Sequence, residues 1–396
     1  MKIYITGIGT DGVKALTHEA EKAVMEADIL IGAERMLRPF RGLGKEMICT
    51  YKPEETARII HDCKGDTAAV LMSGDCGFFS GAKKLLPLLD GHDVRVVSGI
   101  SSMSYFCSLL GIPYDDMKTI SLHGRTANIA VNVRLNERCF FLLGGETDSA
   151  ALCRRLCDNG LSDVTVHIGE DLGYDSERIY SGTAAELIGH RSEKLAVLIT
   201  ENPSFIGHIP SAINDGDFIR SSIPMTKSEV RCNAVAGLSI CRDSVCWDIG
   251  CGTGSVSVEM AFRCPGGRVL AFDRNAEAVR LTAENARRFG CDNIIAAEGS
   301  CPEILSGAET PDKVFIGGTS GKMAEIFECI HSKNPAADIA VTAVSLETLE
   351  QTIQAFGEYG AECETVQISV TRTGRIGTHT MLQAQNPVFL IRGRLI

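Results

Sequence analysis

Three glycines in one short segment have the spacing of a ligand-binding turn. They are Gly250, Gly252 and Gly254 of WDIGCGTG, which follows an apolar run and precedes a stretch with helical spacing. Glycine adopts the positive φ of a tight turn and lets a ligand approach the backbone, and the following helix begins with free N–H groups. Asp273 ends the next apolar run, where an acid can accept the hydroxyls of a ribose.

The details of this loop favour S-adenosylmethionine over a dinucleotide. GCGTG differs from the GxGxxG pattern of dinucleotide-binding folds. Asp248 precedes the glycines at the end of the apolar run, where it could meet the charged methionine portion of the cofactor. We therefore expect Asp248, the three glycines and Asp273 to bind S-adenosylmethionine. The alternative is a tight turn between a strand and a helix that binds nothing.

The second half of the chain resembles the decarboxylating precorrin methyltransferases of cobalamin biosynthesis. The similar segments are MTKSEVR (225–231), WDIGCGTGSVSVEMA (247–261), NARRFG (285–290) and DKVFIGG (312–318). The resemblance implies that the glycine loop and Asp273 hold the cofactor and that Thr226 and Lys227 lie at the mouth of the substrate site. Lys227 is equally compatible with a solvated cation in front of a helix.

The first half contains three glycine-containing loops of another kind. GIGTDG begins at Gly7, SGDCGFFS at Ser73 and SGISS at Ser98, and each follows an apolar run. Such loops can present backbone N–H groups to an anionic or polar ligand, and Asp75 adds a carboxylate. Ordinary turn chemistry is the alternative interpretation.

These loops and SLHGR (121–125) resemble the other precorrin methyltransferase fold, a two-lobed α/β domain with S-adenosylmethionine in the cleft between its lobes. GGETDSAALCRRL and GEDLGYDSERIYSGTAAEL are similar to C5-methylating members, and the resemblance spans roughly residues 1–200. It implies cofactor contacts at Gly74, Asp75, Gly77, Ser101 and Ser102, and substrate contacts at Gly7, Gly9, His123 and Arg125. A purely structural role explains His123 equally well.

This sequence lacks three prolines that the family usually carries in these loops. Thr10, Cys76 and Ser98 stand where the patterns GxGPG, GDP and PGxSS have proline. Because proline fixes φ and stiffens a loop, we expect looser loops or an altered cofactor affinity in the first half.

Apolar runs alternate with helical spacing along both halves, which is typical of an α/β protein with mostly parallel sheets. In the first half we expect strands at 2–9, 28–33, 66–75, 93–99, 139–145, 163–170 and 194–200. In the second half we expect them at 243–250, 267–273, 293–299, 311–318, 338–345 and 386–394. We predict a two-lobed tetrapyrrole methyltransferase domain at 1–205, a linker at 206–223, and a Rossmann-like class I methyltransferase domain at 224–396.

The amino-acid composition indicates which cellular environment and which binding partners to expect for the chain. A net charge of −11 and the lack of a basic cluster disfavour nucleic acid. No apolar run is long enough for a membrane span, and the N-terminus does not resemble a secretion signal. The 16 cysteines include no CxxC pair, so we expect reduced thiols in a cytoplasmic protein and no metal site.

The resemblance implies two S-adenosylmethionine sites and a tetrapyrrole substrate. It assigns C5 methylation to the first half, and C15 methylation with loss of the C12 acetate carboxyl to the second. Because the sulfonium is already a strong electrophile, the protein chiefly has to align the reactants, and we assign no catalytic residue. The substrate carries many carboxylates, so we expect basic groups at its pockets, namely Lys227, Arg231, Arg372 and Arg375. Relatives of both halves assemble, so we expect a homo-oligomer.

Two other functions stay open at this point. One is a two-domain methyltransferase that acts on nucleic acid or protein. NPSF (202–205) and NPVF (386–389) resemble the Asn-Pro-Pro-aromatic motif of amine-methylating enzymes, but both lack the second proline. The other is an enzyme in which only the C-terminal domain is active and the N-terminal half is a non-catalytic module.

Overall fold

A computed structural model describes residues 1–396 except 12–13, 64, 124–126, 145–146, 193–194 and 396. The chain divides into two compact units. Unit 1 comprises Met1–Thr126, Arg138–Leu152 and Thr165–Glu201. Unit 2 comprises Ala127–Glu137, Cys153–Val164 and Asn202–Ile396.

The first sheet of unit 1 has five parallel strands in the order β3-β2-β4-β1-β5. The strands are β1 (Lys2–Gly7), β2 (Ile29–Gly32), β3 (Glu46–Cys49), β4 (Thr67–Met72) and β5 (Asp93–Val97). One face packs on α1 (His18–Glu26), α2 (Glu34–Leu37) and η1 (Arg38–Leu43), and the other on α3 (Pro53–Asp62), α4 (Ala82–Leu85) and η2 (Leu86–Leu89). Because parallel strands end on the same edge, the loops after β1, β4 and β5 meet there.

The second sheet of unit 1 has the order β6-β7-β10-β8-β9. Its strands are β6 (Lys118–Ser121), β7 (Arg138–Leu142), β8 (Thr165–Glu170), β9 (Arg178–Thr183) and β10 (Ala196–Glu201). Helix α5 (Ser102–Leu110) packs on it through Phe106, which contacts Phe140 and Ile199 in one apolar cluster. Only β6 and β7 are parallel, so the expectation of mostly parallel sheets is wrong here. Antiparallel neighbours need no crossover helix, as the short β8–β9 connection shows.

Unit 2 is built on a seven-stranded sheet in the order β13-β12-β11-β14-β15-β19-β16. Its strands are β11 (Val245–Ile249), β12 (Arg268–Asp273), β13 (Ile294–Glu298), β14 (Lys313–Ile316), β15 (Asp338–Ala343), β16 (Cys363–Ile368) and β19 (Val388–Arg394). Strands β11 to β15 are parallel, and β19 is antiparallel to both neighbours. The strand order reverses between β11 and β14, which in open α/β sheets is where ligands bind.

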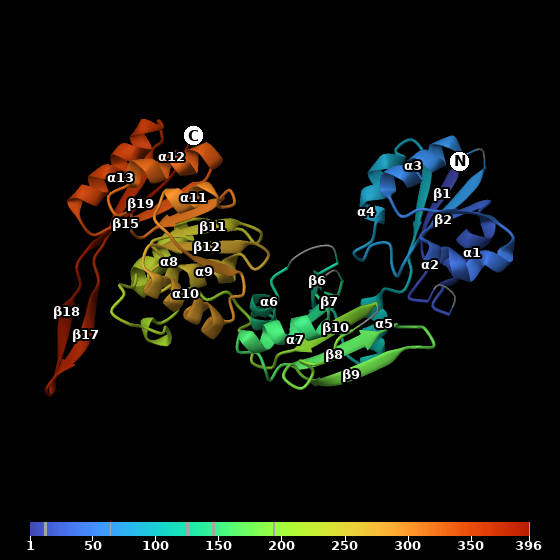
Figure 1. Cartoon of the computed structure of the whole chain (residues 1–396), viewed down its shortest axis with the longest axis horizontal. Helices are drawn as coiled ribbons and strands as arrows, with labels where there is room; N and C mark the ends of the chain where they lie inside the picture. The colour runs from blue at the N-terminus through green and yellow to red at the C-terminus, as the bar shows by residue number, and fades with distance from the viewer. Residues whose placement is uncertain (12–13, 64, 124–126, 145–146, 193–194, 396) are drawn as a thin grey trace. The chain divides into compact units, whose positions relative to one another are not determined.

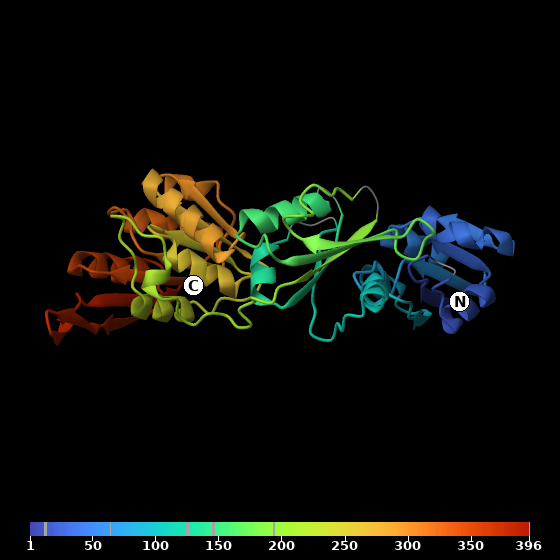
Figure 2. The same cartoon turned by 90° about the horizontal axis from the view of Figure 1, so that it is seen from below.

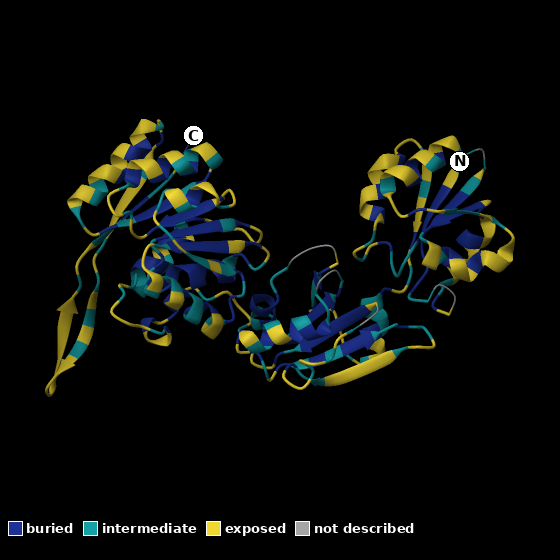
Figure 3. Ribbon diagram, in the orientation of Figure 1, coloured by how far each residue is buried: buried dark blue, intermediate teal, exposed yellow. Residues whose placement is uncertain are grey.

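Helices cover both faces of this sheet (Figure 1). Helices α8 (Ser228–Gly237), α9 (Ser255–Arg263) and α10 (Ala276–Phe289) lie on one side. Helices α11 (Glu303–Ser306), α12 (Met323–Lys333) and α13 (Leu346–Glu358) lie on the other. The central strands between them are buried (Figure 3), so the loops at their carboxyl ends start from a rigid base.

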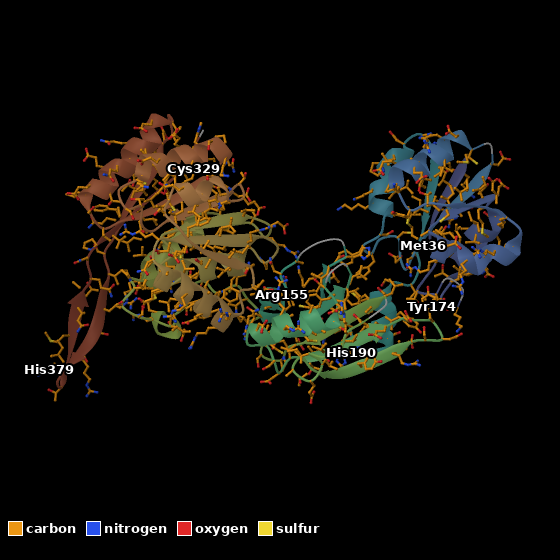
Figure 4. All side chains as sticks on the ribbon, viewed as in Figure 1. Met36, Arg155, Tyr174, His190, Cys329 and His379 are labelled. Atoms are coloured by element: carbon orange, nitrogen blue, oxygen red, sulfur yellow. The ribbon has the colours of Figure 1, made fainter. Side chains whose placement is uncertain are left out.

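Strands β17 (Thr371–Ile376) and β18 (His379–Ala384) form a separate antiparallel ribbon. It extends away from the seven-stranded sheet in both views (Figures 1 and 2), with His379 near its tip (Figure 4). Most of its residues are exposed (Figure 3).

Unit 2 also includes α6 (Ala130–Leu135) and the second part of α7 (Ser149–Asp158). Val131 of α6 belongs to the same buried cluster as Val258 of α9. Asp292 accepts hydrogen bonds from the backbone N–H groups at the start of α6 and pairs with Arg155 of α7 at 2.9 Å. Ile213 and Phe218, which flank η3 (Asp215–Asp217), are buried in this core as well.

Within the described residues, no helix is long and apolar enough to cross a membrane. Among the described residues, the 16 cysteines form no disulfide.

Candidate functional site

The glycine loop of unit 2 is held in shape by close backbone contacts. Gly250 has φ +75°, and a Cβ atom there would lie 2.7 Å from the backbone nitrogen of Gly318. Gly252 has φ +56°, and its Cβ would lie 2.8 Å from the carbonyl oxygen of Pro224. A side chain at either position would displace the neighbouring backbone. The loop therefore requires glycine, and the N–H groups of Gly250 and Gly252 donate to the Phe272 carbonyl and to the Asp273 carboxylate.

Asp273 ends β12 beside this loop. One carboxylate oxygen accepts the Gly252 N–H at 3.1 Å, and the other accepts the Asn275 N–H at 2.9 Å. A carboxylate has lone pairs for further donors. Asp273 thus shapes the glycine loop and can also accept the hydroxyls of a ribose.

A cavity of about 780 Å³ opens at the carboxyl ends of the parallel strands of unit 2. Of the predicted site residues, Thr226, Lys227, Gly250, Gly252 and Asp273 line it. The loop that follows β14 also contributes to the lining. An apolar wall faces the same cavity and consists of Ile223, Met225, Val344, Ile368, Val370 and Val388. The sequence pattern did not indicate this wall, because its residues come from distant segments.

Gly254 lies behind the cavity. It has φ +74°, and a Cβ there would meet Thr282 of α10 at 2.8 Å. Glycine is needed at position 254 because helix α10 approaches the backbone closely. Gly254 does not line the cavity.

Asp248 does not line the cavity either. Its side chain is fully buried, where one oxygen accepts the Ser257 hydroxyl of α9 and the other has no partner among the described residues. Burial raises the pKa of this carboxyl from 3.8 to about 7. The expected direct contact with the methionine portion does not fit this geometry, because the side chain contacts the helix behind the strand.

Arg231 is fully buried, and its guanidinium is occupied by internal partners. It donates to Glu259 at 2.7 Å, to Asp215 at 3.2 Å and to the Thr226 carbonyl at 2.7 Å. The expected contact with a substrate carboxylate therefore does not fit. Arg231 instead anchors the backbone of Thr226, which lines the cavity.

Arg372 is likewise held by acids of its own unit. It donates to Glu229 at 2.9 Å, to Asp215 at 3.0 Å and to the Ser228 hydroxyl at 3.2 Å. These hydrogen bonds raise the pKa of Arg372 and lower that of Glu229. They tie the base of the ribbon to the start of α8. Arg375 lies on the ribbon and does not line the cavity.

Three glycine loops of unit 1 contact one another through their backbones. A Cβ atom on Gly7 would lie 2.7 Å from both the Gly74 oxygen and the Gly99 nitrogen. Gly9 and Gly74 exchange two backbone hydrogen bonds of 3.1 and 2.8 Å. Gly7 and Gly9 therefore pack the loops together and do not line the adjacent cavity.

Asp75 and Cys76 fasten the loop after β4. The Asp75 carboxylate accepts the N–H groups of Gly77 at 2.7 Å and Gly99 at 3.0 Å. The Cys76 thiol donates to the Ile5 and Val97 carbonyls at 3.4 Å, with a pKa raised to about 12 by burial. The thiol that stands in place of the family's proline thus ties this loop to β1 and β5.

A cavity of about 300 Å³ lies beside these loops in unit 1. It is lined by residues of both sheets, by Met36 of α2 and by Tyr174, which lies between β8 and β9; Figure 4 labels Met36 and Tyr174. Of the predicted residues, Gly74, Asp75, Ser101, Ser102 and His123 line it, whereas Gly77 does not. Ser101 also caps α5 by accepting the Ser104 N–H at 3.0 Å. Arg125 lies outside the described residues.

Each unit thus places a glycine-shaped cavity at the carboxyl ends of parallel strands. In unit 2 the glycine loop, the helix after it and Asp273 form the arrangement of an α/β enzyme that binds a nucleoside-containing cofactor. Comparison with known proteins identifies the class of enzyme to which the chain belongs. The model of tetrapyrrole (corrin/porphyrin) methylases matches residues 2–188, and that of the precorrin methyltransferase domain matches residues 217–393.

The chain is also similar to individual proteins, some over one half of its length and some over nearly all of it. A probable cobalt-precorrin-6B C15-methyltransferase (decarboxylating) of Pyrobaculum calidifontis is 40% identical over 43% of this chain and 88% of its own length. A precorrin-6Y C5,15-methyltransferase (decarboxylating) of Sinorhizobium sp is 26% identical over 98% of this chain and 94% of its own. A solved precorrin-6Y C5,15-methyltransferase structure from Geobacter metallireducens has 32% identity and a TM-score of 0.45, covering 48% of this chain and 98% of that one. The chain belongs to the precorrin methyltransferases, and it is an S-adenosylmethionine-dependent methyltransferase.

Proposed function

We propose that this chain methylates C5 and C15 of a precorrin and removes the carboxyl group of the C12 acetate. The observation that carries the proposal is the presence of two glycine-shaped cavities in one chain. The lining of one lies within the segment matched by the precorrin methyltransferase model, and most of the lining of the other lies within the segment matched by the tetrapyrrole methylase model. Full-length relatives with C5,15-methyltransferase names support the pairing of activities. We assign C5 to the domain predicted at 1–205, and C15 with decarboxylation to that predicted at 224–396.

We also propose one S-adenosylmethionine site in each cavity. In unit 2, the glycine turn at Gly250 and Gly252, which both line the cavity, and the carboxylate of Asp273 fit the cofactor. In unit 1, backbone groups near Gly74 and Ser101 take the corresponding role. When bound, the cofactor supplies an electrophilic methyl group. The residues of the chain hold it and the macrocycle in line, which is the main source of acceleration when no strong base is needed.

Titration calorimetry with S-adenosylhomocysteine on the intact chain tests the two-site proposal. We expect two molecules bound per chain, and one in a Gly250→Ala variant, where the new Cβ would collide with Gly318. A single site in the wild-type chain would contradict the proposal and favour a non-catalytic N-terminal module.

We propose a tetrapyrrole substrate with many carboxylates, and the cations at the unit 2 cavity support this. Lys227, Arg274 and Lys322 line the cavity, against the single acid Asp273 among the lining residues described. Relatives named for precorrin-6Y and for cobalt-precorrin-6B both match. Assays with metal-free and cobalt-loaded substrate would establish which form is used.

We further propose a cytoplasmic homo-oligomer that contacts its copies through the β17–β18 ribbon. Ile376 and Met381 lie on one face of the ribbon and Leu382 on the other, and they expose 59%, 49% and 76% of their surface. Exposed apolar side chains favour association. Light scattering should give a mass above one chain for the wild type. A lower mass is expected for a variant with polar residues at these three positions, and a monomeric wild type would contradict the proposal.

A further inference from the structure

The unit 2 cavity contains few side chains that can exchange a proton. Its titratable lining groups are Lys227, Cys251, Asp273, Arg274, Cys301 and Lys322. Decarboxylation of an acetate arm to a methyl group requires one proton donor, because the carbon that loses CO₂ keeps the electron pair of the broken bond. The positions and partners of these groups distinguish among them.

Most of the candidates have another role or cannot release a proton. Asp273 accepts two backbone hydrogen bonds beside the glycine loop. Arg274 is an arginine, which remains protonated in proteins. Lys322 is paired with Glu303 at 2.7 Å. The Cys251 thiol is buried and its sulfur accepts from the Thr282 hydroxyl at 3.3 Å, and the neutral Cys301 thiol does not attract an acetate carboxylate.

Lys227 has a fixed backbone and an ammonium group without an acidic partner in the described part of the chain. It is the N-cap residue of α8 and its side chain makes no capping hydrogen bond. On one side, the Thr226 carbonyl accepts from Arg231 at 2.7 Å. On the other, the Ser228 N–H donates to Asp215 at 3.0 Å, and the Ser228 hydroxyl accepts from Arg372 at 3.2 Å. Two buried or half-buried arginines thus hold both neighbours of Lys227.

The apolar wall continues from this lysine. Ile223 and Met225 precede it in the chain, and Val370 lies two residues before Arg372, whose hydrogen bonds hold the ribbon base to the start of α8. A carboxylate placed against such a wall loses part of its hydration, which favours the loss of CO₂.

We propose that Lys227 is the proton donor of the decarboxylation, and this inference rests on the proposed function of unit 2. The bond between the acetate methylene carbon and its carboxylate carbon breaks as the Lys227 ammonium donates a proton to the methylene carbon. This carbon takes the electron pair of the broken bond and the proton, which makes it a methyl group, and CO₂ leaves. The resulting neutral amine regains its proton from water. Lys227 is then a catalytic residue, and Arg231 and Arg372 are positioning residues.

Mass spectrometry of the product from Lys227→Met and Lys227→Arg variants of the full chain tests this role. Arginine keeps the positive charge but does not donate its proton, so both variants should gain two methyl groups and keep the carboxyl. We expect decarboxylation to slow by about 100-fold or more, which is the usual contribution of a general acid. Lys333→Met in α12 is the control and should still decarboxylate, since Lys333 does not line the cavity and donates to the Ala308 carbonyl at 2.8 Å.

Three outcomes would overturn the inference. Normal decarboxylation by Lys227→Met excludes any need for the residue. Normal decarboxylation by Lys227→Arg alone shows that charge is sufficient and that no proton is transferred. Loss of C15 methylation together with decarboxylation, while S-adenosylhomocysteine still binds, assigns Lys227 to substrate binding. Failure of the proposed function is distinct, because the wild-type chain would then not methylate and decarboxylate the substrate.

Discussion

Neighbouring backbone atoms require glycine at several positions in the loops beside the two cavities. At Gly250 the requirement is twofold, since φ is positive and the Gly318 backbone is close. At Gly7 only the approach of two neighbouring loops matters. Single substitutions should therefore affect one cavity without unfolding the unit that carries it.

Gly250→Ala should remove detectable S-adenosylhomocysteine binding to unit 2. Strain at a left-handed φ costs about 1–3 kcal/mol, to which the collision with Gly318 adds. Titration calorimetry measures the change. Gly307→Ala is the matched control, because no heavy atom lies within 4 Å of its Cβ. Equal affinities of the two variants would contradict this account of the loop.

The buried carboxyl of Asp248 predicts a pH-dependent stability. Its pKa is about 7 in the folded chain against an ordinary value of 3.8, so the folded state binds the proton more tightly. The bound proton stabilises the folded state fully below a pH of 3.8, and this contribution is lost as the pH rises through about 7. Between about pH 5 and about pH 8 we expect the wild type to lose about 3 kcal/mol of unfolding free energy relative to Asp248→Asn.

Urea unfolding of wild type and Asp248→Asn at about pH 5 and about pH 8 measures this difference. The asparagine should be relatively more favourable at the higher pH, because it removes the cost of a buried charge. The same difference in unfolding free energy at both pH values would contradict the assignment.

At the scale of single residues, the sequence predicted those residues of the unit 2 cavity whose role depends on their position in a local turn. Gly250, Gly252 and Asp273 follow strand ends in a recognisable order, and the structure places all three at the cavity. Arg231 could not be placed in the same way. Its role depends on Glu259, a buried acid of another helix, and nothing in the spacing of the two residues shows that they pair.

At the scale of elements, Asp292 holds two helical segments in unit 2. Its side chain is only 3% exposed, accepts three N–H groups at the start of α6 and pairs with Arg155. Asp292→Ala should lower the free energy of unfolding by about 3 kcal/mol, because buried donors to a charged group are left without a partner. Asp158→Ala, which removes an exposed carboxylate of α7, should have little effect.

Thermal and urea unfolding of the two variants measure the contribution of Asp292. If both substitutions lower stability equally, the contacts at α6 do not hold these segments in place.

The elements differ in how well the sequence predicted them. The buried strands β1, β4, β11 and β12 were expected, because continuous apolar runs mark strands covered on both faces. The ribbon strands β17 and β18 were missed, since exposed residues leave no alternation of apolar and polar side chains. The antiparallel order of the second sheet was missed as well, because pairing direction depends on connections and not on composition.

At the scale of the whole molecule, the compact units do not follow the order of the chain. Ala127–Glu137 and Cys153–Val164 belong to unit 2, although both lie within the domain predicted at 1–205. The sequence could not show this, because the contacts of Asp292 and Val131 join residues more than 100 positions apart. The domain limits of 1–205 and 224–396 therefore stay a prediction about evolutionary modules.

The central claim is that two separate sites of one chain carry out the two methylations. Mass spectrometry of the product that the intact chain makes from a precorrin-6Y-type substrate and S-adenosylmethionine tests it most directly, when wild type is compared with Gly250→Ala. The account predicts a gain of two methyl groups with loss of carbon dioxide for the wild type. For the variant it predicts one methyl group and an intact carboxyl. Two methylations and decarboxylation by the variant, or a single methylation by the wild type, would contradict it.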